Sequence, residues 1–146
     1  MKIKGDASEG KKLFTEATCS NCHKVADVGR HVGPDLSRLV DRSPRTLLID
    51  TLDPNRVVEH PYIEYTLLTT DGLPMTGLLL DEAGPSITLA DQKGQSRIVL
   101  RQDIEELVSN NRSQMPENLA ENLTLQQMSD LIAFLANIPQ PHPDAS

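Results

Sequence analysis

The sequence predicts a mainly α protein that carries a small antiparallel sheet of about four strands between its second and last helices. Three observations predict this fold. Capped amphipathic segments lie near both ends of the chain, strand-forming segments alternate with turn residues over residues 62–101, and a Cys-x-x-Cys-His motif follows the first helix. We expect one domain over residues 1–138, of which 62–101 is an insertion, and a Pro-rich tail at 139–146.

The first helix is expected over residues 6–17. Asp6 is a favoured N-cap residue, and Glu9 three positions later completes the pattern of a capping box. Gly10 lies one turn before Phe14, where a residue without a side chain would let another helix approach closely. The apolar stripe of this helix consists of Leu13, Phe14 and Ala17.

Two further helices are predicted by their capping residues. Ser43 as N-cap and Pro44 at the first helical position begin the second helix, which must end before Pro54. Thr124 and Gln127 form a capping box for the last helix. The expected apolar faces are Leu47, Leu48 and Leu52 in the second helix, and Leu125, Met128, Leu131, Ile132, Leu135 and Ile138 in the last helix, which Pro139 ends.

The insertion at residues 62–101 is rich in β-forming residues and turn signals. Asp71-Gly72 is a strong signal for a two-residue hairpin turn, and Pro74 is tolerated best on an edge strand. One helical turn is expected after the last strand, at 103–108. The four expected strands cover residues 62–70, 73–80, 86–90 and 95–100.

The composition excludes several functional classes. With 14 basic and 21 acidic residues the net charge is −7, so neither a nucleic-acid-binding surface nor docking on anionic lipid is expected. No apolar stretch is long enough to cross a bilayer. A core this poor in large rings must be filled by aliphatic side chains, or by a group that the chain does not encode. The aromatic residues are Phe14, Phe134, Tyr62 and Tyr65.

The motif Cys19-Ser20-Asn21-Cys22-His23 contains the two cysteines of the chain and is the attachment signature of a c-type haem. Residues at i, i+3 and i+4 share one face of a helical turn, so Cys19, Cys22 and His23 can all face one flat macrocycle. The two thiols would form thioethers with the haem vinyl groups, and His23 would bind the iron from one side.

Three alternatives to haem are open at this motif. A disulfide that closes so short a loop would constrain the unfolded chain little. A thioredoxin-like redox pair is expected in a βαβ context, which the flanking sequence lacks. A zinc site would need four ligands, and its further candidates lack the close spacing of a zinc finger; these are His31, His60 and His142.

A second motif, Gly33-Pro34-Asp35-Leu36, follows the cysteine motif. Pro34 has no backbone N–H, but its carbonyl can accept a hydrogen bond. A histidine that binds a metal usually donates its other ring N–H to such an acceptor, which fixes the orientation of the ring. Pro34, eleven residues after His23, is therefore a candidate for orienting it.

These features in this order, with a loop Met-Pro and an amphipathic last helix, resemble class I cytochrome c over residues 6–40 and 113–138. The whole pattern, including the strand-rich insertion and the loop Met115-Pro116-Glu117-Asn118-Leu119, is similar to the Pirellula/Verrucomicrobium-type haem-binding domain. Members of that family commonly form the C-terminal part of larger, dehydrogenase-like secreted proteins.

The resemblance implies thioethers at Cys19 and Cys22, His23 as the proximal iron ligand, Pro34 as the residue that orients His23, and Met115 as the distal ligand. It also implies that the first helix crosses the last. The residues expected near that crossing are Gly10, Phe14 and Phe134.

Physical chemistry also favours Met115 as a ligand. A thioether sulfur is a soft ligand, and His/Met ligation raises the reduction potential of haem iron. Pro116 biases Met115 toward extended backbone in a loop that can reach across a macrocycle. The poorer candidates are Met128 on the last helix, Met75 in an expected strand and the terminal Met1, and the alternative distal ligands are His60 and His31.

The expected function is electron transfer by one covalent haem c with His/Met ligation, because a six-coordinate iron has no open site for substrate. The alternative is a five-coordinate haem protein with ligand-sensing or peroxidase-like activity. Expected partners are a redox protein or a fused dehydrogenase-like domain, and the sheet edges of 62–101 could pair in a homodimer. A positive rim for docking could come from Lys11, Lys12 and Lys24, and the haem propionates could be held by Arg30, Arg38, Arg42 or Arg56.

The resemblance also implies a location. Covalent haem attachment takes place outside the bacterial cytoplasm, so we expect a periplasmic or otherwise exported protein. Residues 1–5 lack the apolar stretch of a signal peptide, and we therefore expect that a leader is cleaved or that the domain is part of a longer chain.

Overall fold

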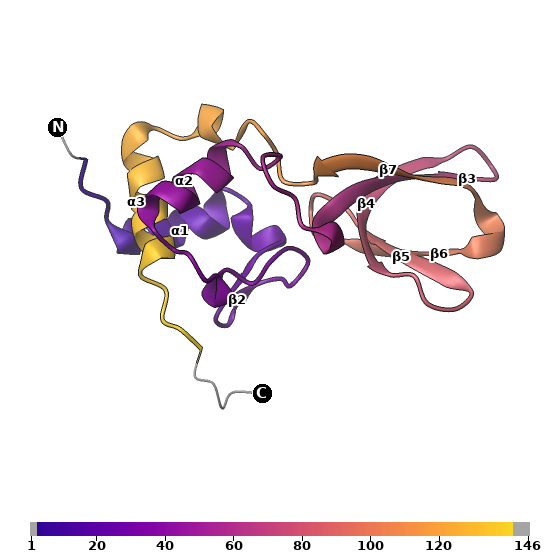
Figure 1. Cartoon of the computed structure of the whole chain (residues 1–146), viewed down its shortest axis with the longest axis horizontal. Coiled ribbons are helices and arrows are strands. Elements are labelled where there is room, and N and C mark those ends of the chain that lie inside the picture. Colours follow the sequence, from indigo (N-terminus) through magenta and orange to yellow (C-terminus); the bar gives the residue numbers. More distant parts are fainter. Residues whose placement is uncertain (1–2, 142–146) are drawn as a thin grey trace. The chain divides into compact units, whose positions relative to one another are not determined.

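The computed structural model describes residues 3–141, and the chain divides into two compact units. We call them the helical unit, which comprises the residues up to Arg56 and those from Pro116 onward, and the β unit, which is Val57–Met115. Figure 1 shows the helices and the sheet that characterise the two units. The helical unit is therefore built from two segments that are distant in sequence, whereas the β unit is continuous.

The helical unit contains three α-helices in the described residues, with short 3₁₀ turns and one small hairpin between them. In chain order its elements are α1 (Ala7–Glu16), η1 (Cys19–Asn21), β1 (Lys24–Val25), β2 (Val28–Gly29), η2 (Leu36–Arg38), α2 (Pro44–Leu52), η5 (Leu119–Asn122) and α3 (Leu125–Ala136).

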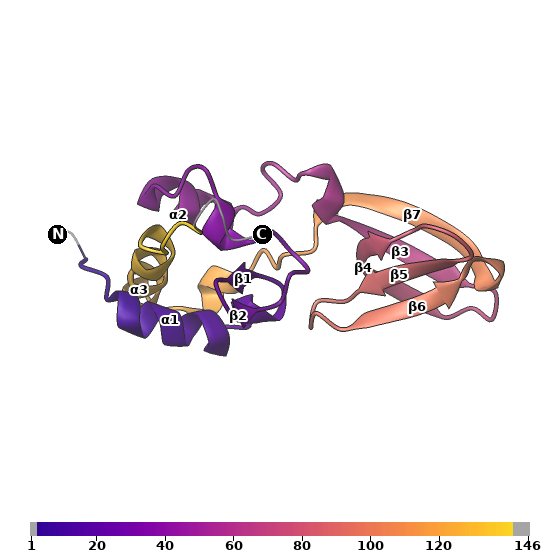
Figure 2. The same cartoon turned by 90° about the horizontal axis from the view of Figure 1, so that it is seen from below.

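Helices α1 and α3 form the centre of the helical unit, and Figures 1 and 2 show them side by side. The rings of Phe14 and Phe134 lie 5.8 Å apart at a tilt of 57°, an arrangement that aromatic pairs favour. A Cβ placed on Gly10 would lie 1.9 Å from the backbone oxygen of Asp130. The predicted crossing of the first and last helices, with these residues at the contact, is confirmed. The buried core consists of Phe14, Val25, Leu47, Met128, Leu131, Ile132, Leu135 and Ile138.

The predicted helix starts are confirmed, with one difference in detail at α1. Asp6 caps α1 by accepting hydrogen bonds from Ser8 N and Glu9 N, but Glu9 does not complete a capping box. Its carboxylate pairs with Lys12, and the backbone N–H of Asp6 donates instead to Asp130 Oδ1 at 2.7 Å. The capping box at the start of α3 is present in full.

Three residues expected on apolar faces lie at the surface instead. Leu125 at the start of α3 is 77% exposed, and Leu48 and Leu52 on α2 are also exposed. Leu47 and Thr51 are the buried residues of α2, so only one edge of this short helix meets the core. The tail predicted at 139–146 lies mostly outside the described residues.

The β unit is a single antiparallel sheet with the strand order β6-β5-β4-β3-β7. Its core contains Leu67, Ile87 and Leu89 from two of the strands, and side chains from the other three strands pack against them. A 3₁₀ turn, η3 (His60–Tyr62), precedes the sheet. The strands are β3 (Ile63–Thr69), β4 (Pro74–Asp81), β5 (Ser86–Ala90), β6 (Ser96–Leu100) and, after the 3₁₀ turn η4 (Arg101–Asp103), β7 (Ile104–Ser113).

The prediction of a mainly α protein is wrong. The chain is 34% helical and 28% strand, with a sheet of five strands rather than about four. The additional strand is β7, where one helical turn was expected at 103–108. A register shift in the pairing of β3 with β7 places Ile104 and Leu107, three residues apart, against the same core. This spacing imitates the period of a helix, which explains the error.

The four predicted strands correspond to β3–β6, but the first hairpin turn differs from the prediction. Thr69 N donates to Leu73 O, and Gly72 N donates to Thr69 O with Gly72 at φ +86°. The loop therefore has three residues with glycine in the left-handed position, instead of a two-residue Asp-Gly turn. Pro74 is tolerated in the inner strand β4 because it is the first residue of that strand.

Candidate functional site

The cysteine motif begins where α1 ends. Thr18 adopts left-handed backbone with φ 66°, which ends the helix and starts the 3₁₀ turn Cys19–Asn21. His23 N donates to Cys19 O at 2.9 Å, so the motif closes into the tight turn that its spacing predicts. A β-branched residue in this conformation costs about 1–3 kcal/mol. Strained backbone therefore lies directly before the first cysteine, at a position that the sequence analysis did not single out.

The loop after the motif folds back over it. The Cys22 carbonyl accepts hydrogen bonds from Val32 N at 3.0 Å and Gly33 N at 2.7 Å. Gly29, at φ +92°, lies so close to His23 that a Cβ there would be 2.0 Å from the histidine carbonyl oxygen. Only glycine fits this approach. Gly29 is not among the residues predicted from the sequence, and the signal that could have identified it is a glycine six residues after a candidate ligand histidine.

This loop brings Pro34 to His23. The Pro34 carbonyl oxygen lies 2.9 Å from His23 Nδ1. A carbonyl oxygen can only accept a hydrogen bond, so Nδ1 carries the ring proton and Nε2 carries the lone pair. Gly33 adds a steric limit, since a Cβ there would be 3.1 Å from His23 Cε1. The ring is thus held in one orientation and one tautomer, with Nε2 as the atom that can bind a metal.

Burial lowers the pKa of His23, and the hydrogen bond to Pro34 opposes this shift only in part. The lowered pKa means that the imidazole is neutral at neutral pH, because desolvation disfavours the charged form. A neutral imidazole is the form that ligates metals. Tautomer, orientation and charge of His23 therefore all suit an axial ligand.

The Cys19 thiol lacks the lowered pKa of a reactive dithiol. Neither Cys19 nor Cys22 forms a disulfide. Burial raises the pKa of the Cys19 thiol, whereas reactive dithiols depend on a lowered pKa. Within residues 3–141, no three His, Cys, Asp or Glu side chains are placed together to hold a metal ion. Of the zinc candidates, His31 and His60 are exposed, and His142 lies outside the described residues.

The surroundings of the motif are apolar. Cys19 packs against the core cluster of the helical unit together with Val28, Leu36 and Leu123. A hollow of about 370 Å³ adjoins the motif at Thr18. Its walls come from α1, η5 and the start of α3, and the apolar side chains among them are Leu13, Ala17, Leu119 and Leu123. Two thiols, a correctly held imidazole and apolar side chains form a donor set that fits a covalently attached haem.

The candidate distal ligands are divided between the two units. Met115 is the last residue of the β unit, half-buried, with its backbone N–H donating to Ser113 Oγ at 3.1 Å. Met128 is buried in the core of the helical unit, which agrees with its predicted place on the apolar face. Met1 lies outside the described residues. Met115 stays the predicted ligand.

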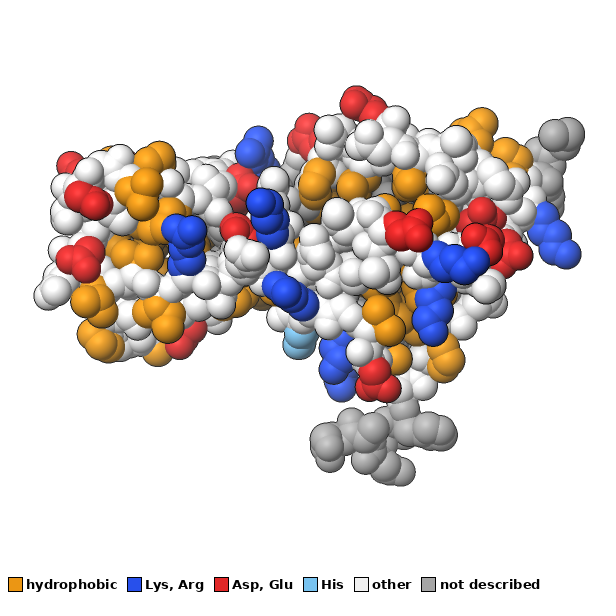
Figure 3. Space-filling view, turned by 180° about the vertical axis from the view of Figure 1, so that it is seen from behind, with side chains coloured by type: hydrophobic (Ala, Val, Ile, Leu, Met, Phe, Trp, Pro, Cys, Tyr) orange, Lys and Arg blue, Asp and Glu red, His pale blue; other side chains and the backbone are white. Residues whose placement is uncertain are grey.

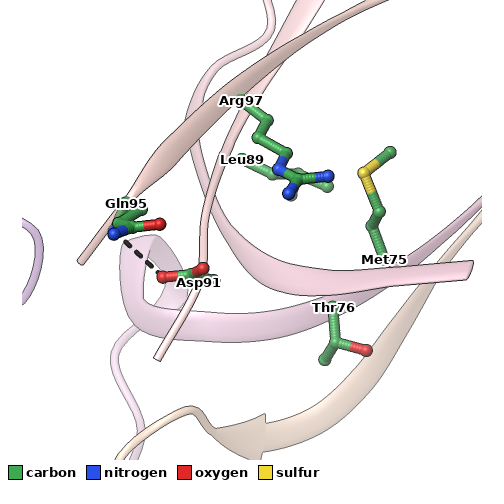
Figure 4. A pocket seen from close by; sticks show the side chains of 6 residues that line it. All are labelled: Met75, Thr76, Leu89, Asp91, Gln95 and Arg97. Carbon is green, nitrogen blue, oxygen red and sulfur yellow. Dashed lines mark hydrogen bonds between the residues drawn. The ribbon is translucent and has the colours of Figure 1, made fainter. Parts of the chain in front are cut away.

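Met75 belongs to a second hollow, of about 170 Å³, on the β unit. Figure 4 shows the Met75 and Arg97 side chains near each other, with Thr76 directed to the other side of its strand. Met75 also packs against the sheet core around Leu67 and Leu89. It is therefore a packing residue of β4, as its position in a predicted strand indicated.

Most of the lysines expected in a docking rim and of the arginines expected to hold the haem propionates contact neighbouring residues. Lys12 pairs with Glu9, which raises the pKa of Lys12, while Lys11 is exposed and Lys24 half-buried. The proposed propionate partners have local contacts of their own. Arg38 pairs with Asp35 at 3.6 Å, Arg56 pairs with Asp50 at 3.0 Å, Arg42 donates to the Ile138 carbonyl, and the backbone of Arg30 donates to Ser20 O.

A protein-family model described as Cytochrome c matches residues 7–67, which is less than half of the chain. The matched range contains Cys19, Cys22, His23 and Pro34 and ends inside β3, so Met115 lies outside it. The match supports a c-type cytochrome. Cytochrome c domains carry a covalently bound c-type haem and act in electron transfer, so the match supports both for this chain. Among curated proteins, none matches the chain.

The described part of the chain has no helix that is both long and apolar enough to span a membrane.

Several apolar side chains of the β unit are exposed, and Figure 3 shows apolar side chains gathered on one face of this unit. The most exposed of these in the sheet is Ile98, at 73%, on the edge strand β6.

Proposed function

We propose that the chain is an electron-transfer module that carries one haem c, attached through Cys19 and Cys22, with His23 and Met115 as axial ligands. The observation that carries this proposal is the 2.9 Å contact between His23 Nδ1 and the Pro34 carbonyl. It leaves Nε2 as the only ring nitrogen that can bind iron, in a motif whose thiols are spaced for thioether attachment.

The residues of the chain would divide the work of electron transfer among them. When bound, the haem supplies an iron that changes between the ferric and ferrous states by one electron. The Pro34 carbonyl makes the His23 ring a stronger donor, and a thioether ligand at Met115 favours the ferrous state. Apolar side chains that pack with Cys19 against the core, among them Leu36 and Leu123, would keep water away from the bound group.

Predictions on the subfamily, the location and the partners of the chain extend this proposal. The likeness to the Pirellula/Verrucomicrobium-type haem-binding domain, with its strand-rich insertion, agrees with the presence of a separate β unit. A periplasmic or otherwise exported location follows from covalent haem attachment. A redox partner protein, a fused dehydrogenase-like domain, and a homodimer through residues 62–101 stay predictions.

The test of attachment is denaturing electrophoresis after expression with the periplasmic machinery for c-type haem attachment. The wild-type band should keep peroxidase stain, because a thioether survives denaturation, and haem extraction should give one haem per chain. The double variant C19A/C22A should lose the stain, whereas the matched surface variant H60A should keep it. A colourless wild-type band would overturn the proposal.

The test of ligation is the ferric absorption spectrum. A band near the red edge of the visible spectrum, absent in M115A and present in H31A and H60A, is the expected result. A spectrum that M115A leaves unchanged would remove Met115 from the site, and the loss of the band in H60A or H31A would assign the distal position to that histidine.

A further inference from the structure

The most deeply buried charged side chain of the described residues lies in the β unit, away from the cysteine motif in sequence. Glu64 on β3 is 1% exposed. Its Oε1 accepts a hydrogen bond from Asn110 Nδ2 at 2.9 Å and another from Arg112 Nε at 2.9 Å. Both donors come from β7. A buried carboxylate is costly unless it is paired, so this interaction is specified by the fold rather than incidental.

The two donors lie in one β-bulge of β7. Ile63 pairs with Ser113 and Tyr65 pairs with Ser109, so residues 110–112 all lie opposite Glu64. Asn111, in the middle, has left-handed backbone with φ 52°. A bulge of this kind bends a strand and redirects the residues that follow it. Here the bulge is built around the Glu64 carboxylate.

The segment after the bulge is also held by contacts within the β unit. Gln114 is 6% exposed, and its Nε2 donates to the Ala90 carbonyl at 3.0 Å. Met115 N donates to Ser113 Oγ at 3.1 Å. The backbone from the bulge to Met115 is therefore anchored to β3 by Glu64 and to β5 by Gln114, up to the residue proposed as the distal ligand.

We propose that Glu64 is a positioning residue for Met115: it holds the bulge of β7, and with it the backbone that leads into this methionine, in the single form that the proposed ligand role requires. The proposal rests on the proposed role of Met115 as distal ligand. It gives the β unit a task in the proposed haem protein, because β7, the last strand of this unit, leads directly into Met115. Without the Glu64 carboxylate, the left-handed Asn111 loses the contacts on both sides that compensate its strain.

The test compares variants of the full haem-loaded chain. E64L removes the acceptor while keeping the size of the side chain, and R112M removes one donor whose side chain is 59% exposed, so that the fold is disturbed less. The matched control is T69V. Thr69 is also buried and also hydrogen-bonded through its hydroxyl, to Leu73 O, but it lies at the other end of β3.

Two readouts report the ligand rather than the fold. One is the methionine-dependent ferric band near the red edge, and the other is the affinity of the ferric protein for added imidazole, which competes with the distal ligand. We expect E64L and R112M to weaken the band and to bind imidazole about tenfold more tightly, which corresponds to about 1.4 kcal/mol. T69V should keep the wild-type band and affinity.

The outcomes separate the two proposals. If M115A keeps the wild-type band, Met115 is not the ligand, and the role of Glu64 is overturned with it. If M115A loses the band but folded E64L and R112M retain it with wild-type imidazole affinity, the positioning role alone is overturned. If T69V changes both readouts as much as E64L at an equal loss of thermal stability, general loosening of the sheet explains the effect, and the positioning role is again overturned. Should E64L not fold, R112M decides.

Discussion

Gly10 of α1 packs directly against the backbone of Asp130 in α3, where a Cβ at position 10 would lie 1.9 Å from the Asp130 carbonyl oxygen. The same aspartate binds the start of α1 through its side chain, since its Oδ1 accepts from the backbone N–H of Asp6 at 2.7 Å. Two backbone regions more than a hundred residues apart are thus held together by one buried residue. This contact supports the helix that leads into the cysteine motif.

The variant G10A should destabilise the protein by about 1–3 kcal/mol, the usual range for overpacking. The neighbouring atoms are helix backbone, which cannot move away as a flexible side chain can. Thermal unfolding of the haem-loaded protein measures the effect. K11A, at an exposed position on the same helix, is the control. Equal stability of G10A and K11A would contradict the close approach.

The variant G33A should raise the reduction potential. Its Cβ would lie 3.1 Å from Cε1 and 3.3 Å from Nδ1 of His23, which pushes the ring from its hydrogen bond with Pro34. A weaker hydrogen bond makes the histidine a poorer donor and so destabilises the ferric state. P34A is the matched control, because it keeps the carbonyl acceptor. Redox titration decides, and a potential in G33A that equals that of P34A would argue against the role of this hydrogen bond.

Removal of haem should affect the two units unequally. The helical unit contains the proposed attachment site and few aromatic rings, so without the macrocycle its core would lack filling volume and contacts. The β unit has its own core around Leu67, Ile87 and Leu89. In C19A/C22A we expect rapid amide hydrogen exchange in α1 and α3 and retained protection in β3–β5. Protection in α1 equal to that of the haem-loaded protein would contradict this account of the composition.

Asp41 should make the start of α2 sensitive to acid. Hydrogen bonds from the backbone N–H of Ser43, then from the hydroxyls of Thr46 and Ser43, lower the pKa of Asp41. Because the pKa of the folded state lies below the unfolded value of about 3.9, this carboxylate stabilises the fold above that pH. The stabilisation is lost as the pH falls through the folded-state pKa.

The matched variant for this prediction is D41N. The wild type should unfold at a higher temperature than D41N near neutral pH, and the difference should shrink as the pH is lowered below about 4. Thermal unfolding across this pH range measures it. A difference that stays constant with pH would show that the charge of Asp41 does not matter.

Local signals in the sequence predicted local structure well. Ser43, Thr124 and Asp6 begin helices as their capping chemistry requires, and the turn of the cysteine motif follows from its spacing. The contact of His23 with Pro34 was expected because a ligating histidine needs an acceptor. These features depend on residues close together in the chain or on a pairing that chemistry demands.

Features set by long-range packing could not be read from the sequence. The strand β7 has an apolar spacing that resembles a helical turn, and only its pairing with β3 makes Ile104 and Leu107 neighbours of one core. The buried position of Glu64 depends on donors more than forty residues away. Leu125 is exposed although it fits the apolar stripe of α3, because the first residue of that helix extends beyond the core.

The discontinuity of the helical unit has a consequence for the order in which the molecule forms. The β unit is complete once the chain has emerged as far as Met115, because all its strands are consecutive. The cysteine motif emerges much earlier, but α3, against which α1 packs, emerges last. During synthesis or export from the N-terminus, Cys19 and Cys22 are therefore presented on a chain whose helical core cannot yet close. For the proposed haem attachment, the length of chain between the cysteine motif and α3 would set the interval in which these thiols are accessible before the helical core closes.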